Sequence, residues 1–273
     1  MRVHVLQVAY GDTEPMSERV ERVAGMVREQ RGADLVVLPE LWAHGGFDYR
    51  HWAERAEPVD GSVMEAMAKA ARDAGVVLHA GSIVEGLPRD AGDDADRGPE
   101  GRGLWNTSVL LGPGGERLAV YRKIHRFGFG AGEPLLLEAG DEIVALPLLL
   151  GGAEVTTGLA TCYDLRFPEM FRRLVDVGTR LVLMPAAWPA ARVEAWSLLG
   201  RARAIEDQVV LVQCNTAGTH AGVTMGGRSQ VVDATGAVLA QAGDGEEVLA
   251  VDVDLAAVDA WREQFPVLAD RRL

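Results

Sequence analysis

Residues 154–176 read EVTTGLATCYDLRFPEMFRRLVD, and this stretch indicates the class of fold. Residues 154–161 have the composition and boundaries of a buried strand. Cys162 follows directly, and after a short turn residues 168–176 are predicted to form a helix. A strand that passes through a short turn into a helix is a typical unit of layered α/β proteins.

The same alternation continues in both directions along the chain. The other predicted strands, rich in Val, Leu and Ile, cover residues 2–9, 34–38, 76–84, 107–111, 180–184, 209–214, 228–233 and 248–253. The other predicted helices cover residues 17–30, 62–74, 193–206 and 254–263. Ser17 is the expected N-cap of the first helix, and Ser62 with Glu65 has capping-box spacing in the second. We found no internal repeat and expect one α/β domain over residues 1–273.

The composition is that of a soluble globular protein. Of 273 residues, 48% are hydrophobic and 25% are charged, and the formal net charge is −13. No long basic run occurs, which argues against nucleic acid as a partner. The longest apolar stretch, residues 143–153, is too short to cross a bilayer, so no membrane partner is expected. Residues 2–9 do not resemble a secretory signal; we therefore expect a cytoplasmic location, with Cys162 and Cys214 as reduced thiols.

One segment differs from the rest of the chain. Residues 88–103 (PRDAGDDADRGPEGRG) are dense in Gly, Asp, Arg and Pro, with almost no apolar side chains. This composition is typical of a solvated loop, here one that joins two strands.

Cys162 is the first candidate for chemistry. A thiol at a strand-to-helix turn lies where main-chain N–H groups are free to bind an oxyanion. The alternative is a small buried apolar residue, as free cysteines usually are. Cys214, inside the apolar run VVLVQCN, fits that alternative.

A cysteine nucleophile needs a base. The six histidines are scattered, and only His220 lies downstream of Cys162, which leaves a papain-like pair as an open but weakly supported alternative. No histidine pair has metal-ligand spacing, and we expect neither a metal nor a cofactor.

Glu40 and Lys123 are the other candidates. Glu40 follows the predicted strand DLVVLP and precedes Trp42, a setting in which partial desolvation raises the pKa of a carboxyl group. Lys123, in YRKIHRFGFGAGE, has aromatic or small neighbours and could polarise a carbonyl oxygen. The alternatives are a surface carboxylate at a loop start and a lysine that covers a surface.

Together these segments carry a resemblance. LPELW around Glu40, YRKIH around Lys123 and TCYDLRFPE around Cys162 resemble, in order, the signature segments of the nitrilase (carbon–nitrogen hydrolase) superfamily. The likeness extends from VHVLQVAYGD near the start through GRARAIEDQVVLVQCNTAG to FPVLADRR near the end. It implies a four-layer α-β-β-α sandwich and a Glu–Lys–Cys triad.

The resemblance also implies roles. Glu40 would take the thiol proton of Cys162, while Lys123 and the backbone N–H of Tyr163 would hold the tetrahedral oxyanion. The family often has a second glutamate before the cysteine, and here Glu133 fits that position better than its competitor Glu138.

The sequence is most similar to the branch that hydrolyses ω-amides of dicarboxylic acids. Arg166 would then bind a substrate carboxylate, although it could instead pair with Glu169 or another acid, and Trp188 would line the pocket. An N-carbamoyl amino-acid amidohydrolase, an aliphatic nitrilase and a catalytically silent binding relative remain alternatives. The glycine-rich run after His125, RFGFGAG, lacks an acidic residue that many relatives carry, so the substrate is the open point.

Family members commonly pair, so the resemblance implies a homodimer or a larger homo-oligomer. The C-terminal stretch WREQFPVLADRRL would reach the neighbouring subunit.

Overall fold

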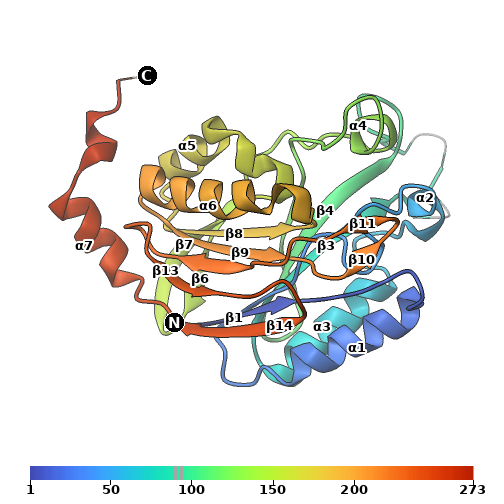
Figure 1. Ribbon diagram of the computed structural model, residues 1–273, viewed down its shortest axis with the longest axis horizontal. Coiled ribbons are helices and arrows are strands. Elements are labelled where there is room, and N and C mark those ends of the chain that lie inside the picture. The colour runs from blue at the N-terminus through green and yellow to red at the C-terminus, as the bar shows by residue number, and fades with distance from the viewer. Residues whose placement is uncertain (89–90, 93–94, 273) are drawn as a thin grey trace.

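The computed structural model describes residues 1–88, 91–92 and 95–272, and two facing sheets of six strands dominate it (Figure 1). The first sheet has the order β14 (Glu247–Asp252), β1 (Arg2–Gln7), β2 (Leu35–Val37), β3 (Val77–Gly86), β4 (Leu104–Leu111) and β5 (Arg117–Arg122). Its central strands β1, β2 and β3 are parallel, whereas β14, β4 and β5 pair antiparallel.

The second sheet repeats this plan. Its order is β13 (Val238–Gln241), β12 (Gln230–Val232), β9 (Val210–Asn215), β8 (Leu181–Ala186), β7 (Ala153–Leu159) and β6 (Ala145–Leu150). Strands β7, β8 and β9 are parallel, and the outer strands are antiparallel. A small hairpin of β10 (Thr219–His220) and β11 (Val223–Thr224) lies outside both sheets.

Helices cover the outer face of each sheet (Figure 1). Those on the first sheet are α1 (Met16–Arg28) and α3 (Ser62–Ala74), and those on the second are α5 (Pro168–Asp176) and α6 (Val193–Asp207). Two short helices, α2 (Trp52–Arg55) and α4 (Glu133–Leu136), lie in connections, and α7 (Ala256–Gln264) projects near the C-terminus. The four layers confirm the predicted α-β-β-α sandwich.

The core lies between the two sheets. Val5 and Val37 of the first sheet belong to the same buried cluster as Leu183 and Val212 of the second. Cys214 is also fully buried there, and its thiol donates to main-chain carbonyl oxygens of the first sheet at 3.3 Å. The interpretation of Cys214 as a buried core residue is confirmed.

Two predicted helix caps were wrong. Helix α1 begins at Met16 with Pro15 as its N-cap, so the helix starts before the expected Ser17. In α3 the hydroxyl of Ser62 donates to Glu57 and no capping box with Glu65 forms. The Glu57 carboxylate also accepts the N–H of Val63, so a residue upstream of the helix satisfies its first donors.

The polar segment 88–103 joins β3 to β4, which pair antiparallel, as predicted for a loop between two strands. Residues 89–90 and 93–94 of that segment lie outside the described residues. The described C-terminal part is held by Glu138, whose carboxylate accepts the N–H groups of Glu100 and Arg102. In the described part of the chain, no helix has both the length and the apolar character needed to cross a bilayer.

Candidate active site

Glu40 lies just beyond the carboxyl end of β2, in a tightly packed turn. The next residue, Leu41, has φ +47°, and its N–H donates to the hydroxyl of Ser82 at 3.1 Å. Gly81 has φ +71°, and a Cβ there would stand 1.9 Å from the carbonyl oxygen of Pro39. Only glycine allows β3 to lie this close to the segment that carries Glu40.

Cys162 lies just beyond the carboxyl end of β7, on the facing sheet. It is the first residue of a 3-10 helix, Cys162–Arg166, and has φ +48°. A positive φ in a non-glycine residue is uncommon, and such residues cluster at functional sites because the surrounding structure must hold them in place. The predicted strand-to-helix turn at Cys162 is therefore present.

Asp164 fixes this turn and joins it to the segment that carries Lys123. Its fully buried carboxylate accepts the N–H of Thr161 at 2.8 Å and the hydroxyl of Tyr121 at 2.7 Å. It also accepts the main-chain N–H of His125 at 3.0 Å. The positions of Cys162 and of Lys123 are therefore coupled through one carboxylate.

Glu40, Lys123 and Glu133 form one buried cluster. The ammonium of Lys123 lies 2.8 Å from Oε1 of Glu40 and 2.9 Å from Oε2 of Glu133. Asn106 completes the cycle, because its Nδ2 donates to Glu40 at 2.8 Å and to Glu133 at 2.7 Å. The other oxygen of Glu40, Oε2, accepts the main-chain N–H of Ala187 at 2.8 Å.

Cys162 lines the same small space as Glu40, Lys123 and Glu133. Burial raises the pKa of the Cys162 thiol well above its ordinary value, and the charge of Glu40 raises it further. The thiol is therefore protonated at neutral pH, and it could act as a nucleophile only if a base took its proton.

The charges of the cluster support one another. Burial alone would lower the pKa of the Lys123 ammonium, but the carboxylates of Glu133 and Glu40 outweigh it and leave that pKa well above its ordinary value. Burial raises the pKa of Glu133, and the charge of Glu40 adds to this against the attraction of Lys123. Lys123 is therefore a permanent cation beside the thiol.

Glu133 and Glu138, the two candidates for the second glutamate, lie in different places. Glu133 contacts Lys123 and Asn106 and lines the space beside Cys162. Glu138 binds the main-chain N–H groups of Glu100 and Arg102 instead. The geometry thus favours Glu133 as the residue near the reacting atoms.

Little open space surrounds the thiol. Cys162 lines two spaces of about 20 Å³ each, which also share Phe47 and Phe127. Arg166 and Trp188 line one of the two, with the Arg166 guanidinium 4.9 Å from the Trp188 ring centroid.

Two predictions about this pocket concern Tyr163 and Arg166. Tyr163 lines the same space as Cys162. The role of its main-chain N–H in binding the oxyanion stays a prediction. Among the ion pairs of the described residues, none joins Arg166 to Glu169. The alternative role of Arg166 as a partner of Glu169 is therefore not supported.

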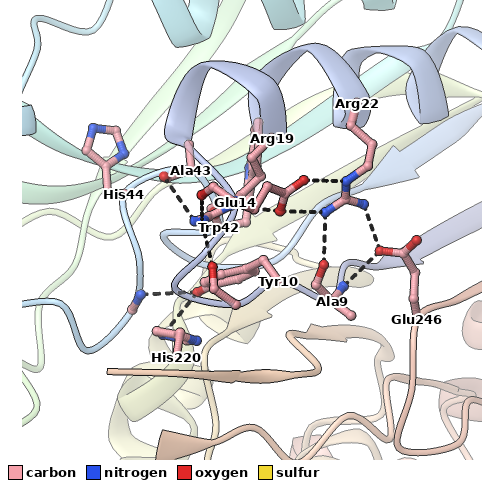
Figure 2. A network of polar contacts seen from close by, with 12 residues as sticks. Ala9, Tyr10, Glu14, Arg19, Arg22, Trp42, Ala43, His44, His220 and Glu246 are labelled. Carbon is pink, nitrogen blue, oxygen red and sulfur yellow. Dashed lines mark hydrogen bonds and ion pairs between the residues drawn. The ribbon is translucent and has the colours of Figure 1, made fainter. Parts of the chain in front are cut away.

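His220 lies in a separate network (Figure 2). Its Nε2 pairs with the hydroxyl of Tyr10 at 3.2 Å, and the two rings stack with centroids 4.3 Å apart. Burial lowers the pKa of His220 to about 4. Arg19 packs on the other side of Tyr10 and donates to carbonyl oxygens of Trp42 and Ala43 (Figure 2).

This network borders a different cavity from the one that holds the thiol. His220 lines a cavity of about 670 Å³, to which Phe47 and Tyr49 also contribute but Cys162 does not. A papain-like pair of Cys162 with His220 is therefore not supported by the geometry.

A sequence profile of the carbon–nitrogen hydrolase family matches residues 2–263. The chain belongs to the carbon–nitrogen hydrolase family. This hydrolase is 45% identical over 270 residues to a 2-oxoglutaramate amidase of Paenarthrobacter nicotinovorans, covering 99% of this chain and 89% of the relative. It is 32% identical over 266 residues to omega-amidase NIT2 of Homo sapiens, covering 94% of this chain and 90% of the relative.

Solved structures show the same sandwich as this carbon–nitrogen hydrolase. A superfamily member from Xanthomonas campestris superposes with a TM-score of 0.85 at 28% identity, covering 100% of this chain and 97% of the other. A mutant amidase from Nesterenkonia sp. AN1 superposes with a TM-score of 0.80 at 27% identity, covering 100% and 94% of the two chains. In that amidase the acetamide moiety of fluoroacetamide is bound covalently to the active-site cysteine.

Three residues of this hydrolase's site did not emerge from the sequence: Asn106, Asp164 and Arg192. Asn106 lies within β4, where a polar residue looks like an ordinary interruption of the strand pattern. Asp164 lies two residues after the thiol, and its spacing from Thr161 was a capping signal that could have been noticed. Arg192 precedes α6 and lines the space at Cys162 with no sequence signal at all.

Proposed function

We propose that this carbon–nitrogen hydrolase releases ammonia from the ω-amide of a small dicarboxylate, with Cys162 as the nucleophile. The observation that carries the proposal is the buried contact of Glu40 with Lys123 beside the thiol, at 2.8 Å. The names of the two amidase relatives support the substrate class.

Acylation begins at the thiol. The Glu40 carboxylate takes the proton of Cys162 as the sulfur attacks the amide carbon, and the electron pair of the C=O bond moves to oxygen. The Lys123 ammonium and the N–H of Tyr163 stabilise that oxyanion. Glu40 then gives its proton to the departing nitrogen, which leaves as ammonia, and the acyl group remains on sulfur as a thioester.

In deacylation, Glu40 acts as a base toward water. Glu40, again a carboxylate, takes a proton from water as its oxygen attacks the thioester carbon. The second tetrahedral intermediate collapses, the C–S bond breaks, and the thiolate of Cys162 regains the proton from Glu40. Glu133 supports both steps by holding the Lys123 ammonium through a second carboxylate contact.

The far end of the substrate meets Arg166 and Trp188. A guanidinium binds a carboxylate through two parallel hydrogen bonds, and Arg166 lies in the same space as the thiol.

Three other activities are compatible with part of this site. An N-carbamoyl amino acid would also offer a carboxylate to Arg166, and an aliphatic nitrile could react with the same thiol. A catalytically silent binding protein would not need the buried Glu40–Lys123 contact, whose burial carries a desolvation cost.

The test measures ammonia release from glutaramate, 2-oxoglutaramate, an N-carbamoyl amino acid and propionitrile. We expect the ω-amides to be the best substrates and Cys162→Ala to abolish turnover. Cys214→Ala removes the other thiol and serves as the matched control, which should keep its activity. Mass spectrometry of the stopped reaction should find a glutaryl thioester on the peptide with Cys162. Full activity of Cys162→Ala on any of these amides would refute the mechanism.

Assembly is part of the same proposal. We propose a homodimer or a larger homo-oligomer, in which helix α6 contributes to the contact, since its side chains Leu198 and Ile205 are 67% and 48% exposed. Light scattering of the purified protein should give at least twice the mass of one chain; a monomeric mass across the micromolar range would contradict the proposal. The reach of the C-terminal stretch to a neighbour and a cytoplasmic location stay predictions.

A further inference from the structure

Two guanidinium groups line the space that contains the Cys162 thiol. Arg166 is half-buried and comes from the 3-10 helix that begins at the nucleophile. Arg192 is exposed and comes from the turn before α6 on the other side of the space. The proposed function uses only Arg166, so the second cation needs an explanation.

Aromatic rings hold both side chains. The guanidinium carbon of Arg166 lies 4.9 Å from the Trp188 ring centroid, and that of Arg192 lies 5.3 Å from the Phe127 ring centroid. Stacking on a ring orients a guanidinium while leaving its N–H groups at the edge unused. Phe127 also lines both spaces at Cys162, so Arg192 is held on a residue of the site itself.

Neither guanidinium is neutralised by an acid in the described residues. Across residues 1–88, 91–92 and 95–272, no hydrogen bond or ion pair from either side chain to a carboxylate is present. Other arginines of the same region do have such partners: Arg126 pairs with Glu100, and Arg203 with Glu206. Ring stacking without a carboxylate leaves two positive charges for a ligand.

The two arginines are also connected to each other through Trp188. The indole N–H of Trp188 donates to the main-chain carbonyl oxygen of Arg192 at 2.8 Å, while the Trp188 ring stacks with Arg166. The main-chain N–H of Trp188 is in turn held by Asn215 at 2.6 Å. One buried indole therefore sets the positions of both cations.

We propose that Arg192 is a second substrate-binding residue, which acts with Arg166 on the carboxylate end of the ω-amide. This inference rests on the proposed function, because it needs a substrate with an acid group at that end. Two unneutralised cations favour an acid amide with no positive charge. They disfavour the same skeleton with a 2-ammonium group, since like charges in a partly desolvated site repel. The pair thus selects against amino-acid amides such as glutamine.

The test compares Arg192→Gln with the wild type on three compounds: glutaramate, glutamine and the neutral pentanamide. For glutaramate we expect KM to rise about 10-fold or more with little change in kcat, as for a lost hydrogen bond to a charged group. Activity on pentanamide should stay within about twofold, because it has no carboxylate. The preference for glutaramate over glutamine, as a ratio of kcat/KM, should fall.

Two further variants separate charge from shape. Arg192→Lys keeps the charge and should retain part of the glutaramate affinity, whereas a role in shaping Phe127 alone would not be rescued. Arg173→Gln on α5 removes another exposed arginine with the same change in net charge, and should leave all three substrates unaffected.

The outcomes are distinct. If Arg192→Gln leaves KM for glutaramate unchanged while Arg166→Gln raises it, the inference about Arg192 is wrong and the proposed function stands. If Arg192→Gln slows pentanamide as much as glutaramate, Arg192 only shapes the pocket, and the inference is again overturned. If the wild type does not prefer glutaramate to pentanamide, the proposed substrate class fails, and this inference fails with it.

Discussion

The main-chain N–H of Ala187 donates a 2.8 Å hydrogen bond to Oε2 of Glu40 across the boundary between the two sheets. Ala187 follows β8 of the second sheet, and Glu40 follows β2 of the first. Because Lys123 and Asn106 occupy the other oxygen, the carboxylate has a single orientation. The Glu40 carboxylate, which we propose as the base, is therefore positioned by both halves of the sandwich.

Glu40→Gln should remove the base and keep the shape of the site. We expect kcat for glutaramate to fall by about 10²–10⁴-fold, the usual contribution of general acid–base catalysis. Alkylation of Cys162 by iodoacetamide should slow as well, because the thiol has lost its proton acceptor. Steady-state kinetics and mass spectrometry check both effects, with circular dichroism to verify folding. Normal turnover in a folded Glu40→Gln variant would exclude Glu40 as the base.

Glu133→Gln and Glu138→Gln form a matched pair. Glu133 holds Lys123, so its loss should reduce kcat by about 10-fold or more, in line with a lost charged hydrogen bond. Glu138 holds the N–H groups of the segment at Glu100 and Arg102, so its loss should leave kcat nearly unchanged and lower the melting temperature. The reverse pattern would assign the second catalytic glutamate to Glu138.

Asn106→Ala tests the cycle around the two glutamates. The hydrogen bond from Asn106 lowers the pKa of Glu133, so removing this donor should raise that pKa further. Deprotonation of the cluster then requires a higher pH, and the acid limb of the kcat/KM profile should move upward. Rescue by Asn106→Gln, if partial, would support a positioning role. A reduced rate with an unmoved acid limb would show that Asn106 affects only packing.

We expect the free energy of unfolding to depend on pH through the Asp207 carboxyl group. Burial raises the pKa of Asp207 from its ordinary value of 3.8 to about 6, although Arg172 lies 3.1 Å away. A raised carboxyl pKa stabilises the fold at pH values below 3.8, and this contribution is lost as the pH rises through about 6. Above pH 7 the ionised Asp207 therefore costs about 2–3 kcal/mol.

Asp207→Asn cannot ionise, so it should be more stable than the wild type at pH 7.5 and nearly equal at pH 4. Urea unfolding at the two pH values measures the difference. Asp60→Asn, at an exposed position, is the control and should show no such difference. An equal effect of Asp207→Asn at both pH values would mean that the substitution acts through packing and not through the removed charge.

The sequence predicted the central strands and the four covering helices well, because buried runs of Val, Leu and Ile are unambiguous there. It missed β5 and β6, which are edge strands of their sheets. In β6, Pro147 breaks the pattern and Leu149 is 73% exposed, both of which are tolerated only at an edge.

The site residues could not be predicted as well from local sequence patterns alone. Glu40, Lys123 and Cys162 each had an ordinary alternative, and only their order along the chain, through the resemblance, brought them together. Asn106 could not be found, because its role depends on the pairing of β4 with β5. Beside that pairing, the main-chain N–H of Lys123 donates to the carbonyl oxygen of Asn106 at 2.8 Å. The proposed role of Arg192 depends on the contact of its guanidinium with the Phe127 ring, and Phe127 is 65 positions away in sequence (192 − 127).

The division of the site between the sheets has a practical consequence. Glu40 and Lys123 extend from the first sheet, whereas Cys162 and the N–H of Ala187 extend from the second. Neither sheet alone carries both the proposed nucleophile, Cys162, and the proposed base, Glu40. Ammonia release is therefore a sensitive gauge of whether the two halves have come together during refolding, and it should return only after the inter-sheet core has formed.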